Sequence, residues 1–189
     1  MKFIKNTLIV LILIVAPLLA KAQGEMKAAV GYTPQIGYMV YMLEDLKNKV
    51  ENQVKDLDQS QTDFVYDSKA NSIGGLVMHL VSTEMYYQLQ TLGEGSWTEV
   101  EKKLLQSAGD LNQESKSKLK EKPISYYLKL WDQVRQRTLE ALKTKDDAWF
   151  AENIDEGINN HYVWYHVMQH TANHNGQIAS IKNRLPKQD

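Results

Sequence analysis

Four of the five histidines in this 189-residue chain lie within fourteen residues, at His161, His166, His170 and His174. The last three are spaced four residues apart, so on an α-helix they lie one above another on a single face. Residues four apart on a helix are near neighbours, and two such imidazoles can bind one cation. The fifth histidine, His79, lies in a separate apolar segment. A third ligand from that second helix would complete a three-histidine metal site with open coordination positions.

The composition limits the other chemistry that is available. The chain has no cysteine, which excludes disulfides, thiolate ligands, a cysteine nucleophile and a lipoprotein anchor. A soft-metal site must therefore use histidine and carboxylate, and any thiol must come from another molecule. The net charge is -1 and the lysines are scattered, so no nucleic-acid partner is expected.

The N-terminus has the composition of a secretory signal peptide. Lys2 and Lys5 precede an apolar run, which ends in a small-x-small cleavage motif at Ala22. We predict a signal peptide over residues 1–22 and export of residues 23–189 to the periplasm or the extracellular space. A membrane anchor is the alternative, but the apolar run is too short to cross about 30 Å of hydrocarbon. No stable membrane anchor is expected after cleavage.

Apolar residues recur at intervals of three and four in four segments, which predicts four long amphipathic helices. These segments are residues 33–57, 72–92, 123–142 and 159–185. Ser72 is the expected N-cap of the second helix, Gly93 closes it, and Pro186 ends the last. Residues 97–120 are polar and lysine-rich, and we expect a long connection that contains one or two short helices. The predicted fold is all-α, a four-helix bundle with a long crossover connection between helices 2 and 3.

Several local features complete the prediction. Residues 58–61 are a polar break, and Trp149 and Phe150 are expected to close one end of the core. Gly74 and Gly75 suit close packing at the start of the second helix. No segment alternates with period two for long enough to predict a strand. A set of aromatic residues is expected to be mostly core, with one or two walling a pocket: Tyr86, Tyr87, Trp131, Tyr162, Trp164 and Tyr165.

Two stretches resemble a known family. Residues 170–178, HTANHNGQI, resemble the HxxxHxGQI signature that closes the DinB-like superfamily, and residues 72–84 resemble its S-I-x-x-x-x-x-H-L-x-x-T-E stretch. The resemblance implies that residues 23–189 form a DinB-like four-helix bundle with a divalent metal near one end. Its three metal ligands map onto His79, His170 and His174. Zinc, nickel and manganese are associated with such sites, and three imidazoles also suit ferrous iron, so one divalent transition metal of these four is expected.

Other polar residues near the motifs have more than one interpretation. His166 could act as a proton shuttle or donate a hydrogen bond to a ligand, and we favour the second role. Glu84 lies five residues after His79, about 140° around the helix, which favours helix packing or capping over metal ligation. His161 lies off the stripe and is expected at the surface or rim. Gln177 is expected to hydrogen-bond across the bundle.

Gly176, also in the signature, is expected to let a neighbouring helix approach closely. Dimers are common among the proteins that this chain resembles, so a homodimer is a further expectation.

The resemblance favours a metal-dependent enzyme that acts on an unknown small molecule. The superfamily includes thiol-dependent S-transferases and a mycothiol-dependent isomerase, in which a metal lowers the pKa of a small thiol. A hydrolase in which a metal-bound water is the nucleophile is a second possible kind of metal-dependent enzyme. Export disfavours the thiol form, because such thiols are mainly cytosolic. The alternatives are a non-catalytic metal-binding or stress-associated module, and a plain bundle whose histidines pack in the core.

Overall fold

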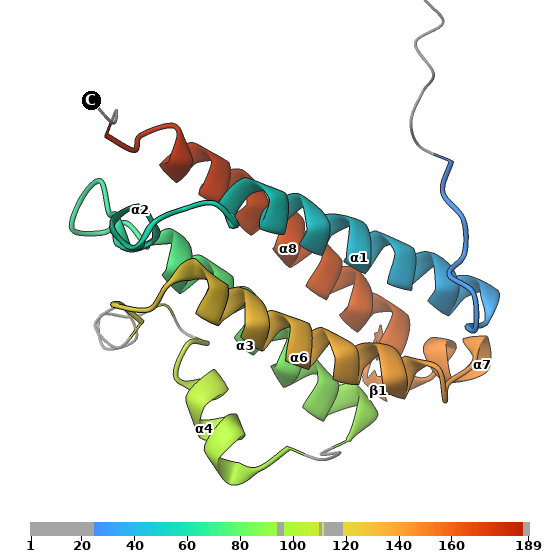
Figure 1. Ribbon diagram of the computed structural model, residues 1–189. Coiled ribbons are helices and arrows are strands. Elements are labelled where there is room, and N and C mark those ends of the chain that lie inside the picture. The colour runs from blue at the N-terminus through green and yellow to red at the C-terminus, as the bar shows by residue number, and fades with distance from the viewer. Residues whose placement is uncertain (1–24, 94–96, 110, 112–118, 187–189) are drawn as a thin grey trace, which may run out of the picture.

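The structure, a computed structural model, describes residues 25–93, 97–109, 111 and 119–186. The predicted signal peptide over residues 1–22 lies outside this part of the chain. None of the helices that the structure describes is long and apolar enough to cross a membrane. Four long helices dominate the fold (Figure 1): α1 (Pro34–Val54), α3 (Ile73–Leu92), α6 (Ile124–Leu142) and α8 (Asn160–Lys182).

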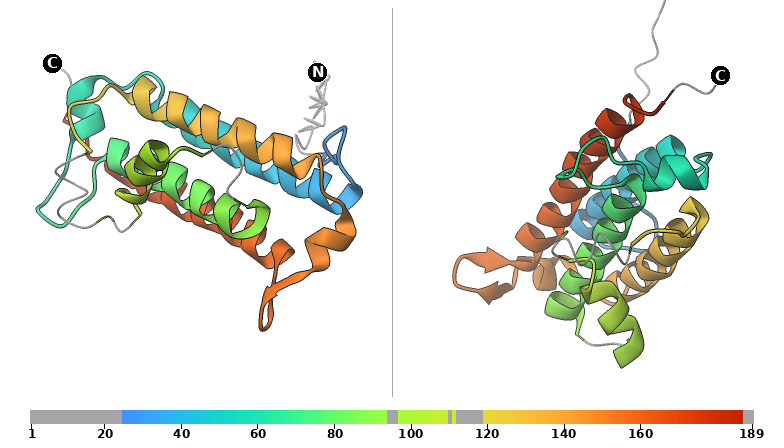
Figure 2. Two further views of the ribbon diagram at one scale, coloured as in Figure 1. Left: turned by 90° about the horizontal axis from the view of Figure 1, so that it is seen from below. Right: turned by 90° about the vertical axis from the view of Figure 1, so that its left-hand side faces the viewer.

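The four long helices enclose one core. Helix α1 packs on α8 and α6, and α3 packs on α6 and α8, so the helices form a closed ring. Figure 1 shows that α3 and α6 run in one direction while α1 and α8 run in the other. Figure 2 shows the same arrangement from below and from one end. Parallel neighbours need a connection that returns along the bundle, and α4 (Glu99–Gln106) lies in it. The predicted four-helix bundle with a crossover between its second and third long helices is therefore confirmed.

The ends of α3 follow the capping signals in the sequence. Ser72 is the N-cap of α3, and its Oγ accepts a hydrogen bond from the Gly75 N–H at 3.1 Å. The helix ends at Leu92, where Gly93 has a φ of +84°, a conformation that glycine adopts without strain. The two capping residues in the sequence therefore predict both ends of α3.

The predicted polar break at residues 58–61 is instead the start of a short helix, α2 (Gln59–Asp63). Asp58 accepts a hydrogen bond from the Gln61 N–H, and the Gln61 side chain accepts one from the Asp58 N–H. This reciprocal pair is a capping box, which stabilises a helix start even in a wholly polar segment.

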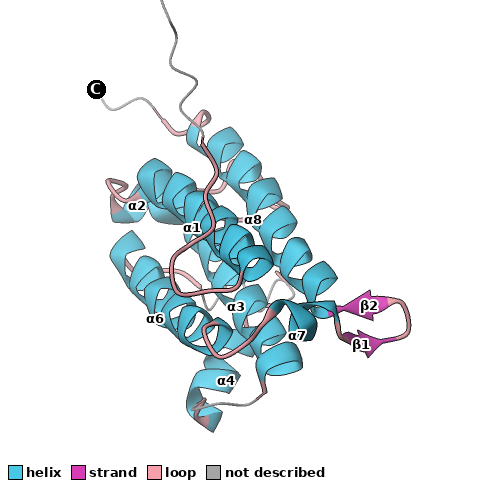
Figure 3. Ribbon diagram, turned by 90° about the vertical axis from the view of Figure 1, so that its right-hand side faces the viewer, coloured by secondary structure: helices cyan, strands magenta, loops and turns pink. Residues whose placement is uncertain are grey.

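A small β-hairpin after α6 was not predicted. Strands β1 (Asn153–Asp155) and β2 (Ile158–Asn159) pair antiparallel between α7 (Asp147–Ala151) and α8, and Gly157 in the turn has a φ of +73°. Figure 3 shows that the hairpin projects from one end of the bundle. Strands of three and two residues are too short to give a period-two pattern.

The aromatic residues divide between the core and the surface. Trp131, Trp164 and Phe150 are buried, and Phe150 closes one end of the core between α1 and α8, as predicted. Tyr86, Tyr162 and Tyr165 are instead 52%, 56% and 42% exposed, so the expectation that the aromatic set is mostly core is wrong for these three. Helical spacing places a residue on a face but does not say whether another element covers that face.

Two glycines differ in what surrounds them. A Cβ at Gly74 would lie 2.8 Å from Tyr127 Cε2 and 3.0 Å from Thr62 Cγ2, which confirms close packing at the start of α3. Gly176 is exposed, and a Cβ there would meet nothing within 4 Å. The expectation that a neighbouring helix approaches Gly176 closely is therefore wrong, because this position of α8 faces away from the other helices.

The two glycines should respond oppositely to alanine. Gly74→Ala is expected to lower the free energy of unfolding by about 1–3 kcal/mol, because the new methyl group overpacks the contact with Tyr127. Gly176→Ala is expected to raise it by about 0.5–1 kcal/mol, because alanine loses less backbone entropy in an exposed helix. Urea denaturation followed by circular dichroism measures both, and equal effects at the two positions would contradict the packing seen here.

Candidate metal centre

The structure brings His79, His170 and His174 to one point between α3 and α8. Each residue offers one nitrogen, and the three nitrogens lie within 4.8 Å of one another. The ring centroid of His79 is 4.9 Å from those of both His170 and His174, which are 4.4 Å apart. Helix α3 packs directly on α8, so the stripe at four-residue spacing faces the histidine of the other helix. These are the three residues that the sequence predicts as ligands.

Hydrogen bonds fix the proton positions on two of these rings. His79 Nδ1 lies 3.1 Å from the carbonyl oxygen of Ala108. A carbonyl oxygen only accepts, so His79 Nδ1 carries the proton, and in the neutral ring Nε2 is then the unprotonated nitrogen. His174 Nδ1 likewise donates to Gln177 Oε1 at 3.0 Å. Metal-binding histidines usually donate their second ring N–H to such a partner, which holds the ring in one orientation.

The third ring completes a cluster that fits a divalent cation. His170 Nε2 lies 2.9 Å from His79 Nε2, and since the latter is unprotonated, His170 donates this hydrogen bond. Thr83 Oγ1 is 3.5 Å from the same His170 nitrogen. A neutral imidazole can move its proton to the other ring nitrogen, which leaves Nε2 free for a cation. Metal–nitrogen bonds of about 2.0–2.1 Å would need the two nitrogens to separate by only a few tenths of an ångström.

The surroundings of His170 and His174 favour the neutral form of both rings. Burial, followed by the charges that His174, His79 and His166 would carry, lowers the pKa of His170 to about 4. Burial and His79 also lower the pKa of His174, although its hydrogen bond to Gln177 opposes this. Metal ligands must be deprotonated, so a cation that binds near neutral pH would not compete with protons.

Acid should therefore destabilise the metal-free protein through His170. Its pKa is about 4 in the folded state and 6.5 in the unfolded chain, so between these values the unfolded chain holds more protons. Stability should fall as the pH falls through this window, by about 1–2 kcal/mol after allowance for solvent at the half-buried ring. Urea unfolding at pH 7, 5.5 and 4 with a chelator measures this loss. His170→Asn should show a shallower fall, and an identical pH dependence in both proteins would contradict the assignment.

His161 and His166, the other two histidines between residues 161 and 174, lie outside the cluster of His79, His170 and His174. His166 packs edge-on against Tyr87, with ring centroids 5.4 Å apart, and its centroid is 5.8 Å from that of His170. The Nδ1 atoms of His79 and His174 donate to the Ala108 carbonyl and to Gln177 Oε1 rather than to His166. His161 is exposed and stacks on Phe150 with centroids 4.3 Å apart, which agrees with its predicted position off the stripe.

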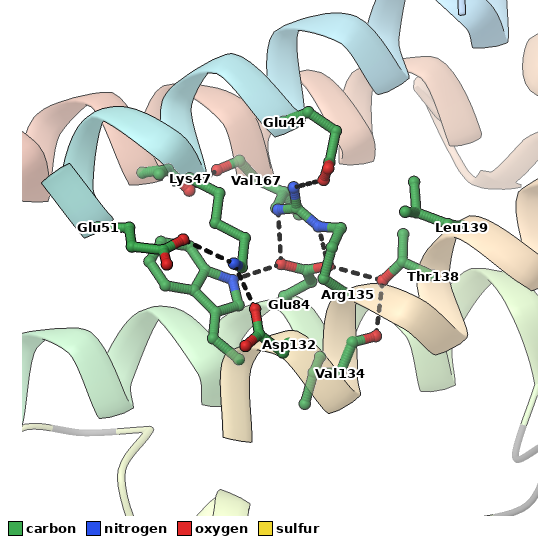
Figure 4. A network of polar contacts seen from close by, with 12 residues as sticks. Glu44, Lys47, Glu51, Glu84, Asp132, Val134, Arg135, Thr138, Leu139 and Val167 are labelled. Atoms are coloured by element: carbon green, nitrogen blue, oxygen red, sulfur yellow. Dashed lines mark hydrogen bonds and ion pairs between the residues drawn. The ribbon is translucent and has the colours of Figure 1, made fainter. Parts of the chain in front are cut away.

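The Glu84 carboxylate lies in a buried polar network with residues of α6 (Figure 4). Its carboxylate accepts hydrogen bonds from Arg135 Nε and Nη2 at 2.7 and 2.8 Å, and from Thr138 Oγ1 at 2.7 Å. Trp131 Nε1 donates to the same carboxylate at 2.9 Å. All four residues belong to the packing between α3 and α6, so the predicted packing role of Glu84 is confirmed.

Two hydrogen-bond acceptors of the histidine cluster differ from what the sequence predicts. Gln177 bonds to His174 within its own helix, so the expectation that it reaches across the bundle is wrong. A residue three positions later on a helix lies beside the first, which makes this contact local. The Ala108 carbonyl, from the crossover after α4, was missed because a backbone acceptor has no signal in side-chain chemistry. The crossover thus helps to orient His79.

A pocket adjoins the histidine stripe at the end of the bundle that bears the hairpin. It has a volume of about 440 Å³ and lies between α3, the β1–β2 hairpin and α8. His166 lines it, as do Tyr86, Tyr87 and Tyr162. Aromatic residues therefore wall a pocket, as predicted, although three of them do so rather than one or two.

The comparisons with known proteins agree with this geometry. The model of a family described as mycothiol-S-transferase matches residues 38–186, a span that includes all three clustered histidines and most of the bundle. No curated protein matches the chain.

Proposed function

Because the chain belongs to the mycothiol-S-transferase family, we propose that it transfers a low-molecular-weight thiol to an electrophile with the help of one divalent metal. His79, His170 and His174 would hold the metal. The observation that carries the proposal is the convergence of three imidazoles, two of them oriented by hydrogen bonds from Nδ1. Three protein ligands leave coordination positions open, which is typical of catalytic rather than structural sites.

The chemistry needs two substrates from outside the chain. When held by the three histidines, a divalent cation would lower the pKa of a small thiol, so that thiolate would be available near neutral pH. In the transfer, a sulfur–carbon bond forms, and the bond from that carbon to the leaving group breaks with its electron pair on the leaving group. The thiol proton passes to solvent. Since the chain has no cysteine, the sulfur must belong to a diffusible thiol.

The chain's own residues orient the ligands and leave access on one side. The Ala108 carbonyl and Gln177 each accept a hydrogen bond from Nδ1, of His79 and His174 respectively, and so orient the Nε2 atoms of these rings toward the cluster. Ala108 is fully buried, and it covers the cluster on the side of the crossover. His166 lies one helical turn before His170 and lines the adjacent pocket, so that pocket is the approach for an electrophile.

An assay of thiol conjugation tests the proposal. The purified protein, loaded in turn with zinc, nickel, manganese or ferrous iron, is mixed with an electrophile such as monobromobimane. Mycothiol, glutathione and cysteine are supplied as separate thiols. We expect metal-dependent conjugation with at least one thiol, and its loss in His79→Ala and in the presence of a chelator. No conjugation with any pair, despite full metal loading, would favour the hydrolytic or the non-catalytic alternative.

We further propose that the protein is exported through residues 1–22. The basic start, apolar run and small-x-small motif support this, and residue 23 would become the new N-terminus. Cell fractionation followed by N-terminal sequencing should find the protein outside the cytoplasm and beginning at Gln23. An uncleaved cytoplasmic protein would contradict export. Export would also restrict the thiol to one that is available outside the cytoplasm.

A further inference from the structure

The pocket beside the histidines has an unusual lining. Three tyrosines surround it, Tyr86 and Tyr87 from α3 and Tyr162 from α8, and Asp155 of the hairpin completes one wall. We call it the tyrosine pocket. Tyr86 and Tyr162 are more than half exposed although they face this hollow, so their rings are not covered by other parts of the described chain. Large aromatic surfaces left open inside a pocket are typical of ligand sites.

We propose that the tyrosine pocket binds an organic cation, in which an ammonium group is joined to an apolar body, and that it holds this compound next to the three-histidine cluster. Electron-rich faces of tyrosine attract ammonium groups, and several rings around one hollow form an aromatic cage. Tyr86 and Tyr87 stand edge to face, with ring centroids 5.1 Å apart and planes at 80°. That arrangement presents aromatic surface from two directions.

The charges of the residues that line the pocket determine whether it favours a cationic or an anionic ligand. Among the described residues that line the pocket, Asp155 alone carries a formal charge, and none is a lysine or an arginine. The hydroxyl of Tyr87 also interacts electrostatically with those of Tyr86 and Tyr162. Burial raises the pKa of Tyr87, and the neighbouring hydroxyls of Tyr86 and Tyr162 raise it further. An anion would meet a carboxylate and the negative faces of the rings, whereas a cation would be attracted by both.

The pocket and the histidine cluster share a boundary. His166 lines the pocket, contacts Tyr87, and has its ring centroid 5.8 Å from that of His170. Tyr87 lies one helical turn after Thr83, whose hydroxyl is 3.5 Å from His170 Nε2. A compound held by the tyrosines would therefore extend past His166 toward the cluster. The binding of this compound does not depend on the proposed function. The further statement that the compound is the electrophilic substrate does rest on it.

Titration of the metal-free protein with benzyltrimethylammonium, followed by NMR, tests the binding. We expect saturable binding and nuclear Overhauser contacts from the probe methyl groups to the rings of His166 and Tyr162. Tyr162→Ala and Asp155→Asn should each weaken binding at least fivefold. Tyr38→Ala, which removes a similarly exposed tyrosine from α1, should leave it unchanged. Unchanged binding in Tyr162→Ala, or contacts that do not include His166, would overturn the proposal.

A matched pair of ligands tests the charge. Choline should bind at least tenfold more tightly than 3,3-dimethylbutan-1-ol, its neutral isostere, and phenylacetate should not bind. Equal affinity for choline and the alcohol, or a preference for phenylacetate, would contradict a cation site. The same titration in His170→Ala separates this proposal from the proposed function. Probe binding should persist there, and it should persist in the wild type even if no thiol transfer is found.

Discussion

Replacing His170 with alanine should reduce the bound divalent metal from about one equivalent to almost none and weaken the affinity at least 100-fold. The ring centroids of His79, His170 and His174 all lie within 4.9 Å of one another, so removal of His170 leaves only two nitrogens at the site. Two imidazoles without a third protein ligand rarely hold a cation in an oriented site. Inductively coupled plasma mass spectrometry of protein purified without a histidine tag measures the metal content.

Matched variants distinguish this loss from a general effect of removing a histidine. His161→Ala should keep full metal content, because His161 is on the same helix but stacks on Phe150 outside the cluster. Gln177→Ala should weaken the affinity about 10–100-fold, because it removes the partner of His174 Nδ1 but no ligand. Metal content that survives in a His79→Ala/His170→Ala double variant would contradict the site. So would wild-type protein that stays metal-free after incubation with zinc, nickel, manganese and ferrous iron.

The sequence was informative where side chains repeat at helical spacing. Apolar stripes identified all four long helices, and the four-residue spacing placed His170 and His174 on one face. Only the resemblance to the DinB-like superfamily pairs His79 with these two residues. The spacing of residues within one helix does not predict which residue of another helix lies against them. The crossover was predictable because four helices with one long connection allow few topologies.

The remaining parts depend on contacts that the pattern does not contain. Nothing in the sequence marks the Ala108 carbonyl as the partner of His79, because any residue offers a carbonyl. The exposure of Tyr86 and Tyr162 depends on where the short hairpin projects, and a strand of two or three residues gives no periodic signal. Helix α2 is a different case. Its capping pair, Asp58 and Gln61, is visible in the sequence and was outweighed by the polarity of the segment.

Arg135→Ala is the second large effect that the structure predicts, with a loss of about 3–5 kcal/mol in the free energy of unfolding. Arg135 and Glu84 are only 3% and 1% exposed, and they form a bidentate ion pair in the core. Burial alone would raise the pKa of Glu84, but Arg135 and the hydrogen bonds from Thr138 and Trp131 lower it, so the carboxylate is charged. Removal of Arg135 would leave the buried carboxylate with the hydrogen bonds from Thr138 and Trp131 but without its ion-pair partner, which is the costly change. Urea denaturation measures the loss.

Two controls separate the buried pair from surface charge and from the metal site. Arg137→Ala should cost about 1 kcal/mol or less, because Arg137 and its partner Glu101 are partly exposed at 29% and 35%. A Glu84→Gln/Arg135→Met double variant removes both charges, so it should be more stable than Arg135→Ala. It should also bind one equivalent of metal, because Glu84 faces α6 and not the histidines. A double variant that is folded but metal-free would show that Glu84 acts on the metal centre, contrary to the contacts that its carboxylate makes here.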